Sequence, residues 1–210
     1  MRAALAISAV LFGSGVAQAT PDQPVSLGPG SIVFWTSAQD GNADRFRDTL
    51  LIEGEDFAIY QTESDWAAGD ETDYFALFSG IYYNTCDLEM PNAEERAALA
   101  ALWPLTEGDR VEIATDQGAS LEIGEASEFF LMGKRHAAHQ ISISYLGEEA
   151  SEETVFVLDD APMTVAVHWE GGGRDSATLV TRPKSVASTP VDTDLIGTCA
   201  SLLNNQTDKN

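Results

Sequence analysis

The sequence predicts a mainly β fold, either an antiparallel sandwich or a curved, partly open barrel, with one short helix packed on it. Short segments rich in β-branched and aromatic residues recur along the chain, and Gly, Asn and Asp turn signals separate them. Only the segment at about 93–103 has a clear helix pattern. Many short strands at nearly regular spacing are typical of sandwiches and barrels.

The first half of the chain predicts an antiparallel meander. Its expected strands are 31–37, 46–53 and 57–62, with turns at Asp40-Gly41-Asn42 and at Gly54–Asp56. The polar, acidic segment 63–73 predicts a loop. Residues 74–83 are apolar at both alternating sets of positions, which favours one central strand covered on both faces, with a bend or bulge at Gly80.

The helix is predicted by its two ends. Asn92 and Glu95 have the spacing of a capping box, so the helix should begin at Ala93. The alanine-rich segment that follows has high helix propensity. Pro104 disfavours helical geometry at Trp103, which predicts the end of the helix there.

Short strands resume after the helix. We expect them at 109–115, 119–125, 127–132, 139–146, 153–158, 162–170 and 175–182. Apolar and polar residues alternate between His139 and Tyr145, and again between Thr164 and Glu170. This alternation predicts one buried face, while the opposite face could meet solvent or line a cavity.

The N-terminus has the pattern of a cleaved signal peptide. Arg2 precedes a short apolar run, and Ala17-Gln18-Ala19 forms a cleavage site, which predicts cleavage after Ala19. The apolar run is too short to span a bilayer. We therefore predict export to the bacterial periplasm or the extracellular space. The expected organisation is a signal peptide at 1–19, a single β-rich domain at 20–203, and a disordered tail at 204–210.

The charge balance excludes some partners. After loss of Arg2, the chain has 10 Lys and Arg residues against 34 acidic residues, a net charge of −24. Binding to nucleic acid or anionic lipid needs basic residues that neutralise phosphate, so neither is expected. The acidic surface is interpreted as a solubilising coat, with a cationic partner or a divalent-ion sink as the alternative.

Cys86 and Cys199 are the two cysteines of the chain. In an oxidising compartment an even pair predicts a disulfide, and a separation of 113 positions is unlike the Cys-x-x-Cys of redox sites. The bond would attach the C-terminal segment to the chain just before the helix.

No motif predicts a cofactor or a metal. His136 and His139 are three apart, a spacing that suits a metal on a helix, whereas residues three apart on a strand face opposite sides. The acidic segment 40–44 resembles a calcium loop in its alternate oxygen ligands but lacks the Gly and the bidentate Glu of that loop. His168 could act as a general base, although no motif supplies its triad partners.

Two short segments carry a family resemblance. Leu102-Trp103-Pro104-Leu105 before a Gly, followed by strands ending in Ala177-Thr178-Leu179-Val180-Thr181-Arg182-Pro183, resembles a group of uncharacterised exported bacterial β proteins. That resemblance implies export and a β fold, and it implies no activity.

Our first functional hypothesis is a non-enzymatic exported domain that binds an apolar or amphiphilic ligand, or an envelope partner. The candidate ligand-binding residues are the aromatic side chains near the helix: Phe75, Phe78, Tyr82, Tyr83 and Trp103. They could line a pocket beneath the helix, or form a plain hydrophobic core with the helix as its lid. The alternatives are a hydrolase with a scattered site around His168, and a structural protein-interaction domain with an exposed apolar patch.

Overall fold

One curved antiparallel sheet of eleven strands makes up most of the part of the chain that the structure describes, as the sequence predicted. The computed structural model describes residues 27–64, 72–115, 117–147, 150–183 and 191–207. The predicted signal peptide, the greater part of the acidic loop and residues 184–190 and 208–210 lie outside these ranges.

The strands before the helix are β1 (Ile32–Gln39), β2 (Asn42–Glu53), β3 (Phe57–Ser64), β4 (Asp73–Phe78) and β5 (Tyr82–Thr85). Those after it are β6 (Arg110–Ile113), β7 (Ala119–Leu131), β8 (Lys134–Tyr145), β9 (Ser151–Leu158), β10 (Thr164–Trp169) and β11 (Arg174–Thr181). The helices are α1 (Ala93–Ala100), the 3₁₀ turn η1 (Gly197–Cys199) and α2 (Ala200–Thr207).

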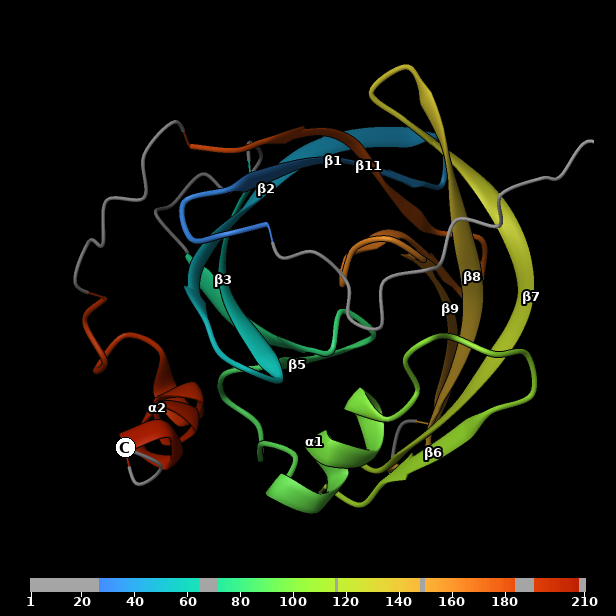
Figure 1. Cartoon of the computed structure of the whole chain (residues 1–210). Helices are drawn as coiled ribbons and strands as arrows, with labels where there is room; N and C mark the ends of the chain where they lie inside the picture. The colour runs from blue at the N-terminus through green and yellow to red at the C-terminus, as the bar shows by residue number, and fades with distance from the viewer. Residues whose placement is uncertain (1–26, 65–71, 116, 148–149, 184–190, 208–210) are drawn as a thin grey trace, which may run out of the picture.

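The order of the strands explains why the sheet curves back on itself. Hydrogen-bonded neighbours follow the order β5-β4-β3-β2-β1-β11-β10-β9-β8-β7-β6, so the first and last strands pair at the centre and the chain's middle strands form the two edges. The two edge strands, β5 and β6, are joined by the segment that contains α1. Figure 1 shows α1 between them, in the opening of the curved sheet.

Several boundaries differ from the prediction, and β2 and β8 begin earlier than expected, at Asn42 and Lys134. The segment expected as one central strand is β4 and β5, separated by a turn in which Ser79 and Gly80 have positive φ. The two strands expected at 119–125 and 127–132 are one strand, β7, with a register shift between Ile123 and Ala126. The helix ends at Ala100 rather than Trp103.

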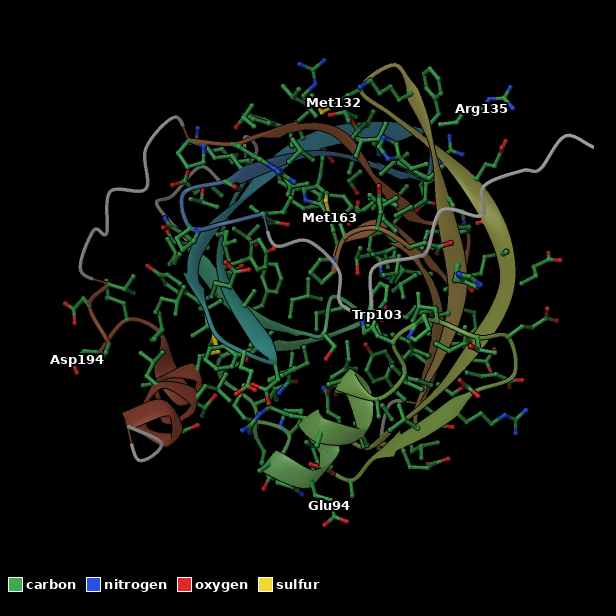
Figure 2. The ribbon with its side chains drawn as sticks, in the orientation of Figure 1. Glu94, Trp103, Met132, Arg135, Met163 and Asp194 are labelled. Carbon is green, nitrogen blue, oxygen red and sulfur yellow. A yellow bond between two sulfur atoms is a disulfide. The ribbon has the colours of Figure 1, made fainter. Side chains whose placement is uncertain are left out.

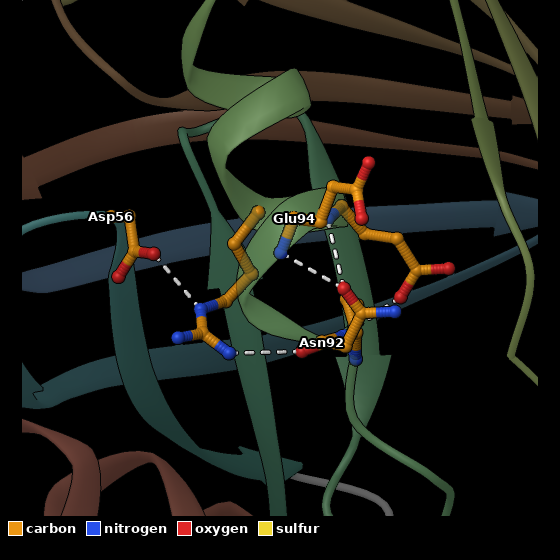
Figure 3. A network of polar contacts seen from close by, with 6 residues as sticks. Asp56, Asn92 and Glu94 are labelled. Atoms are coloured by element: carbon orange, nitrogen blue, oxygen red, sulfur yellow. Dashed lines mark hydrogen bonds and ion pairs between the residues drawn. The ribbon is translucent and has the colours of Figure 1, made fainter.

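The predicted capping box of α1 is confirmed, and it attaches the helix to its surroundings (Figure 3). The side chain of Asn92 accepts hydrogen bonds from the N–H groups of Glu94 and Glu95. One carboxylate oxygen of Glu95 accepts from the Asn92 N–H, and the other accepts from the N–H of Ala114, just after β6. Arg96 Nε donates to Asp56 Oδ2 at 2.8 Å, which fixes the helix to the β2–β3 turn.

The C-terminal segment packs beside β5. Cys86 and Cys199 form a disulfide with their Cα atoms 5.1 Å apart, and Thr198 N donates to the Cys86 carbonyl. Leu202 of α2 is buried in the same hydrophobic cluster as the two cysteines. The helix α2 continues to Thr207, whereas the sequence predicted a disordered tail from Asn204.

The largest hydrophobic core lies between α1, the β3–β5 strands and the inner face of β7–β9. Its fully buried members include Ile59, Phe78, Leu99, Ile141 and Val155. A second core gathers around Val33, Leu131 and Val165, on β1, β7 and β10.

The β4–β5 hairpin packs against the β9–β10 connection, although these strands are not neighbours in the sheet. Thr164 Oγ1 donates to the Gly80 carbonyl at 3.1 Å. A Cβ atom added to Gly80 would lie 2.2 Å from the backbone carbonyl carbon of Pro162. The hairpin can therefore approach so closely only because position 80 is a glycine.

We predict that Gly80→Ala destabilises the protein by about 3 kcal/mol or more, because it combines the cost of a positive φ with a backbone clash. Gly41→Ala is the matched control, since Gly41 has φ +84° and no atom within 4 Å of an added Cβ. The control should lose only about 1 kcal/mol. Urea unfolding of both variants measures the difference, and equal losses would contradict the close approach.

Candidate functional site

A cavity of about 260 Å³ lies on the concave face of the sheet. Strands β1 to β5, β10 and β11 all contribute to its wall. Most lining side chains are aromatic or aliphatic: Trp35, Phe46, Tyr60, Tyr74, Phe75, Tyr83, Trp169, Val33, Leu77, Met163 and Val167. Figure 2 shows Met163 within the curve of the sheet. Concave, mainly apolar cavities with a few polar groups are typical of ligand sites.

The β4–β5 hairpin separates this cavity from the largest core. Residues paired across antiparallel strands share a face, and the register pairs Leu77 with Tyr83 and Phe78 with Tyr82. Leu77 and Tyr83 line the cavity, whereas Phe78 and Tyr82 are fully buried in the core with α1. One face of the hairpin therefore forms a wall of the cavity and the other is packed.

The five aromatic residues chosen from the sequence are divided among these environments. Phe75 and Tyr83 line the cavity, with their rings 6.5 Å apart in an edge-on arrangement. Phe78 and Tyr82 lie in the core. Trp103 borders a separate hollow beside α1, where its Nε1 donates to the Ser79 carbonyl at 2.9 Å. The structure does not bring all five together beneath the helix.

Asp48 is a nearly fully buried acid on the wall of the cavity. It is 5% exposed and accepts a hydrogen bond from Thr62 Oγ1 at 2.7 Å. Burial raises the pKa of Asp48 to about 7, and the charge of Asp175 adds to the rise. The hydrogen bond from Thr62 and a weaker contact from the Trp35 N–H oppose it. Near neutral pH this carboxyl group therefore exchanges between its neutral and ionised forms.

Two further polar groups on the cavity wall lack full hydrogen bonding. The Oδ1 atom of Asp175 and the indole Nε1 of Trp35 are buried, and neither reaches good hydrogen-bond geometry with any described atom. Burial raises the pKa of Asp175, and Ser37 opposes the rise. Buried polar atoms are usually paired, so these two atoms indicate a place where a ligand group could bond.

Tyr83, which lines the cavity from β5, takes part in a polar contact with β8 and β9. Glu153 is 5% exposed and accepts hydrogen bonds from Tyr145 Oη at 2.7 Å and Tyr83 Oη at 3.3 Å. Burial raises the pKa of Glu153, and the two tyrosines oppose the rise. The same surroundings raise the pKa values of Tyr83 and Tyr145, so both phenols stay protonated donors at neutral pH.

The histidines lie away from this cavity. His168 is exposed, its ring packs at 4.9 Å from that of Phe156, and it makes no hydrogen bond to a described carboxylate or hydroxyl. His139, on β8, has its Nδ1 atom 2.7 Å from Asp159 Oδ1. Within the described ranges, no three His, Cys, Asp or Glu residues gather as metal ligands. The geometry that the hydrolase alternative requires of His168 is thus not present.

Sequence reasoning missed Asp48, Asp175 and Trp35 as site residues. The sequence could have indicated Asp48, because positions 46, 48 and 50 of a strand share one face and Phe46 and Leu50 are apolar. An acid at an inward position of a strand is uncommon without a partner. The position of Asp175 beside the same cavity depends on the pairing of β1 with β11, which connects opposite ends of the chain.

No known protein family matches the chain, and a search of curated proteins finds no match. Three solved structures resemble the fold. The first is an exported protein of Bacteroides fragilis that is described as having a YmcC-like fold. It has 8% identity and a TM-score of 0.42, and the match covers 76% of this chain and 98% of that one. The hypothetical lipoprotein YmcC from Escherichia coli has 12% identity, a TM-score of 0.44, and coverage of 77% and 92%.

A third structure, named as a lipoprotein of Parabacteroides distasonis, has 7% identity, a TM-score of 0.41, and coverage of 76% and 97%. Likenesses at this level carry no functional argument for the present chain. In the described residues, no helix has the length and apolar character needed to cross a bilayer.

We predict that Asp48→Asn raises stability at about pH 8 but hardly changes it at about pH 4. The pKa of Asp48 is about 7 in the folded protein against an ordinary value of 3.8, so the wild-type protein loses stability as pH rises between those values. The difference amounts to roughly 4 kcal/mol, at about 1.4 kcal/mol per pKa unit.

Urea unfolding of both proteins across this pH range measures the effect. Glu153 titrates in both proteins, so the difference between them reports Asp48 together with its coupling to Asp175. Asp44→Asn, an exposed position on the same strand, is the control and should keep the wild-type pH dependence. Parallel pH curves for wild type and Asp48→Asn would contradict the assignment.

Proposed function

We propose that this protein is an exported, non-enzymatic domain that binds a small, mainly apolar ligand in the cavity between β1–β5 and β10–β11. The observation that carries the proposal is the cavity itself, a preformed space walled by seven aromatic residues and only a few polar groups. Its volume of about 260 Å³ is slightly below the roughly 300–1,000 Å³ common for drug-sized ligands. The expected ligand is therefore small, such as a single ring or a short chain.

The arrangement of the wall also supports binding. Two stacked aromatic pairs line it, Trp35 with Phe46 at 5.7 Å and Tyr60 with Phe75 at 5.1 Å between ring centroids. Rigid rings lose little conformational entropy when a ligand binds. The β4–β5 hairpin, which forms one wall of the cavity, is held in place by the hydrogen bonds from Tyr83 to Glu153 and from Thr164 to Gly80.

The export part of the proposal rests on the signal-peptide pattern and on the disulfide. Disulfides persist in oxidising compartments such as the periplasm. Cys86 and Cys199 are bonded in the structure.

A second candidate is docking of an envelope protein at the β7–β8 hairpin. Phe130 and Met132 are 67% and 56% exposed at its end, beside the exposed cations Lys134 and Arg135. Figure 2 shows Met132 and Arg135 projecting from the end of this hairpin. Exposed large apolar side chains next to charges are typical of interaction surfaces.

Native mass spectrometry of the mature protein, purified gently from the exported fraction, tests the ligand. We predict extra mass that disappears on denaturation. Val167→Trp should abolish it by filling the cavity, whereas Leu179→Trp, on the 40% exposed Leu179 of β11, should retain it.

A bare mass in the wild-type protein, or the same extra mass in both variants, would contradict binding in this cavity. A bound protein chain that is lost in Phe130→Ser would favour the second candidate instead.

A further inference from the structure

The cavity contains acidic groups and no basic group. Its lining residues include Asp48, Asp73 and Asp175 but no Lys, Arg or His. Asp73 is exposed at the rim, whereas Asp48 is 5% exposed and Asp175 is half-buried. None of the ion pairs between described residues involves Asp48 or Asp175. Buried charged groups are normally paired, whereas neither carboxyl group has a counter-ion among the described residues.

The two carboxyl groups flank one aromatic side chain. In the sheet register, Trp35 on β1 pairs with Phe46 on β2 and with Ala177 on β11. Asp48 and Asp175 therefore lie two residues away from Trp35 on its two neighbouring strands, in opposite directions. All three line the same cavity, and their charges are close enough that Asp175 contributes to the raised pKa of Asp48.

The carboxyl oxygens of Asp48 and Asp175 can accept more hydrogen bonds than the described residues supply. Asp175 Oδ1 is a buried acceptor that no donor of the described residues meets in good hydrogen-bond geometry. A carboxylate can accept up to about four hydrogen bonds. Asp48 accepts one from Thr62 in the described structure. A ligand group with several N–H donors would satisfy these acceptors.

The aromatic wall favours the same kind of group. Faces of Trp, Tyr and Phe rings attract cations, and the attraction is stronger when the site is desolvated. Trp35, Phe46, Tyr60, Phe75 and Trp169 provide such rings around the two carboxyl groups. The chain's net charge of −23 also raises the local concentration of cations near the protein.

We propose that the ligand is a small hydrophobic amine, whose protonated nitrogen binds between Asp48 and Asp175 while its hydrocarbon part contacts the aromatic rings. This inference rests on the proposed ligand-binding function and specifies its chemistry. An anionic ligand is disfavoured, because it would add a third negative charge to a buried site that has no cation.

Isothermal titration calorimetry at about pH 8 tests the proposal with three probes of one shape: 2-phenylethylamine, the neutral 2-phenylethanol and the anionic 3-phenylpropanoate. We expect the amine to bind at least about tenfold more tightly than the alcohol, and the anion to show no binding. Asp48→Asn and Asp175→Asn should each remove most of this preference while the alcohol still binds. The exposed control Asp44→Asn should keep it.

The outcomes separate this inference from the proposed function. If the alcohol binds as tightly as the amine, the cavity binds apolar ligands and the amine assignment is overturned. If neither probe binds to the wild-type protein, the ligand-binding function fails together with the inference. If the amine binds with equal preference in both Asp variants and Val167→Trp, its site lies elsewhere and the assignment is also overturned.

Discussion

The structure depends on one contact that its hydrogen-bonded ladders do not provide: the β4–β5 hairpin held against β9 and β10. Glu153 joins Tyr145 and Tyr83 across this contact, and the close approach of Gly80 to Pro162 completes it. Burying a carboxyl group here is tolerated because two phenols donate to it. As a result, the inside of the curved sheet is divided into a packed core and an open cavity.

This division explains why the cavity contains features that are unfavourable for stability alone. The described core around α1 and β7–β9 is almost entirely aliphatic and aromatic and contains no acid, although the Tyr82 hydroxyl buried there also lacks good hydrogen-bond geometry. The cavity has Asp48 and Asp175 on its wall. Groups that raise the free energy of the empty protein are expected where a ligand supplies the missing contacts.

Local signals in the sequence predicted the fold class, the turns and the start of α1, because capping and strand propensity act over a few residues. The disulfide-forming residues followed from cysteine count and compartment. The division of the aromatic residues could not be predicted: Phe78 and Tyr83 look alike in sequence, and their environments differ because the Ser79-Gly80 turn folds one predicted strand into two. Asp175 reaches the cavity through β1–β11 pairing, a contact between distant parts of the chain.

Crystallography of the mature protein under xenon pressure tests the central claim, the division of the interior, most directly. Xenon enters apolar cavities that are preformed and leaves close-packed cores empty. The account predicts xenon beside Trp35, Phe75 and Val167, and none between α1 and β7–β9. Xenon found only in the core around α1, or side chains filling the space beside Trp35, would contradict it.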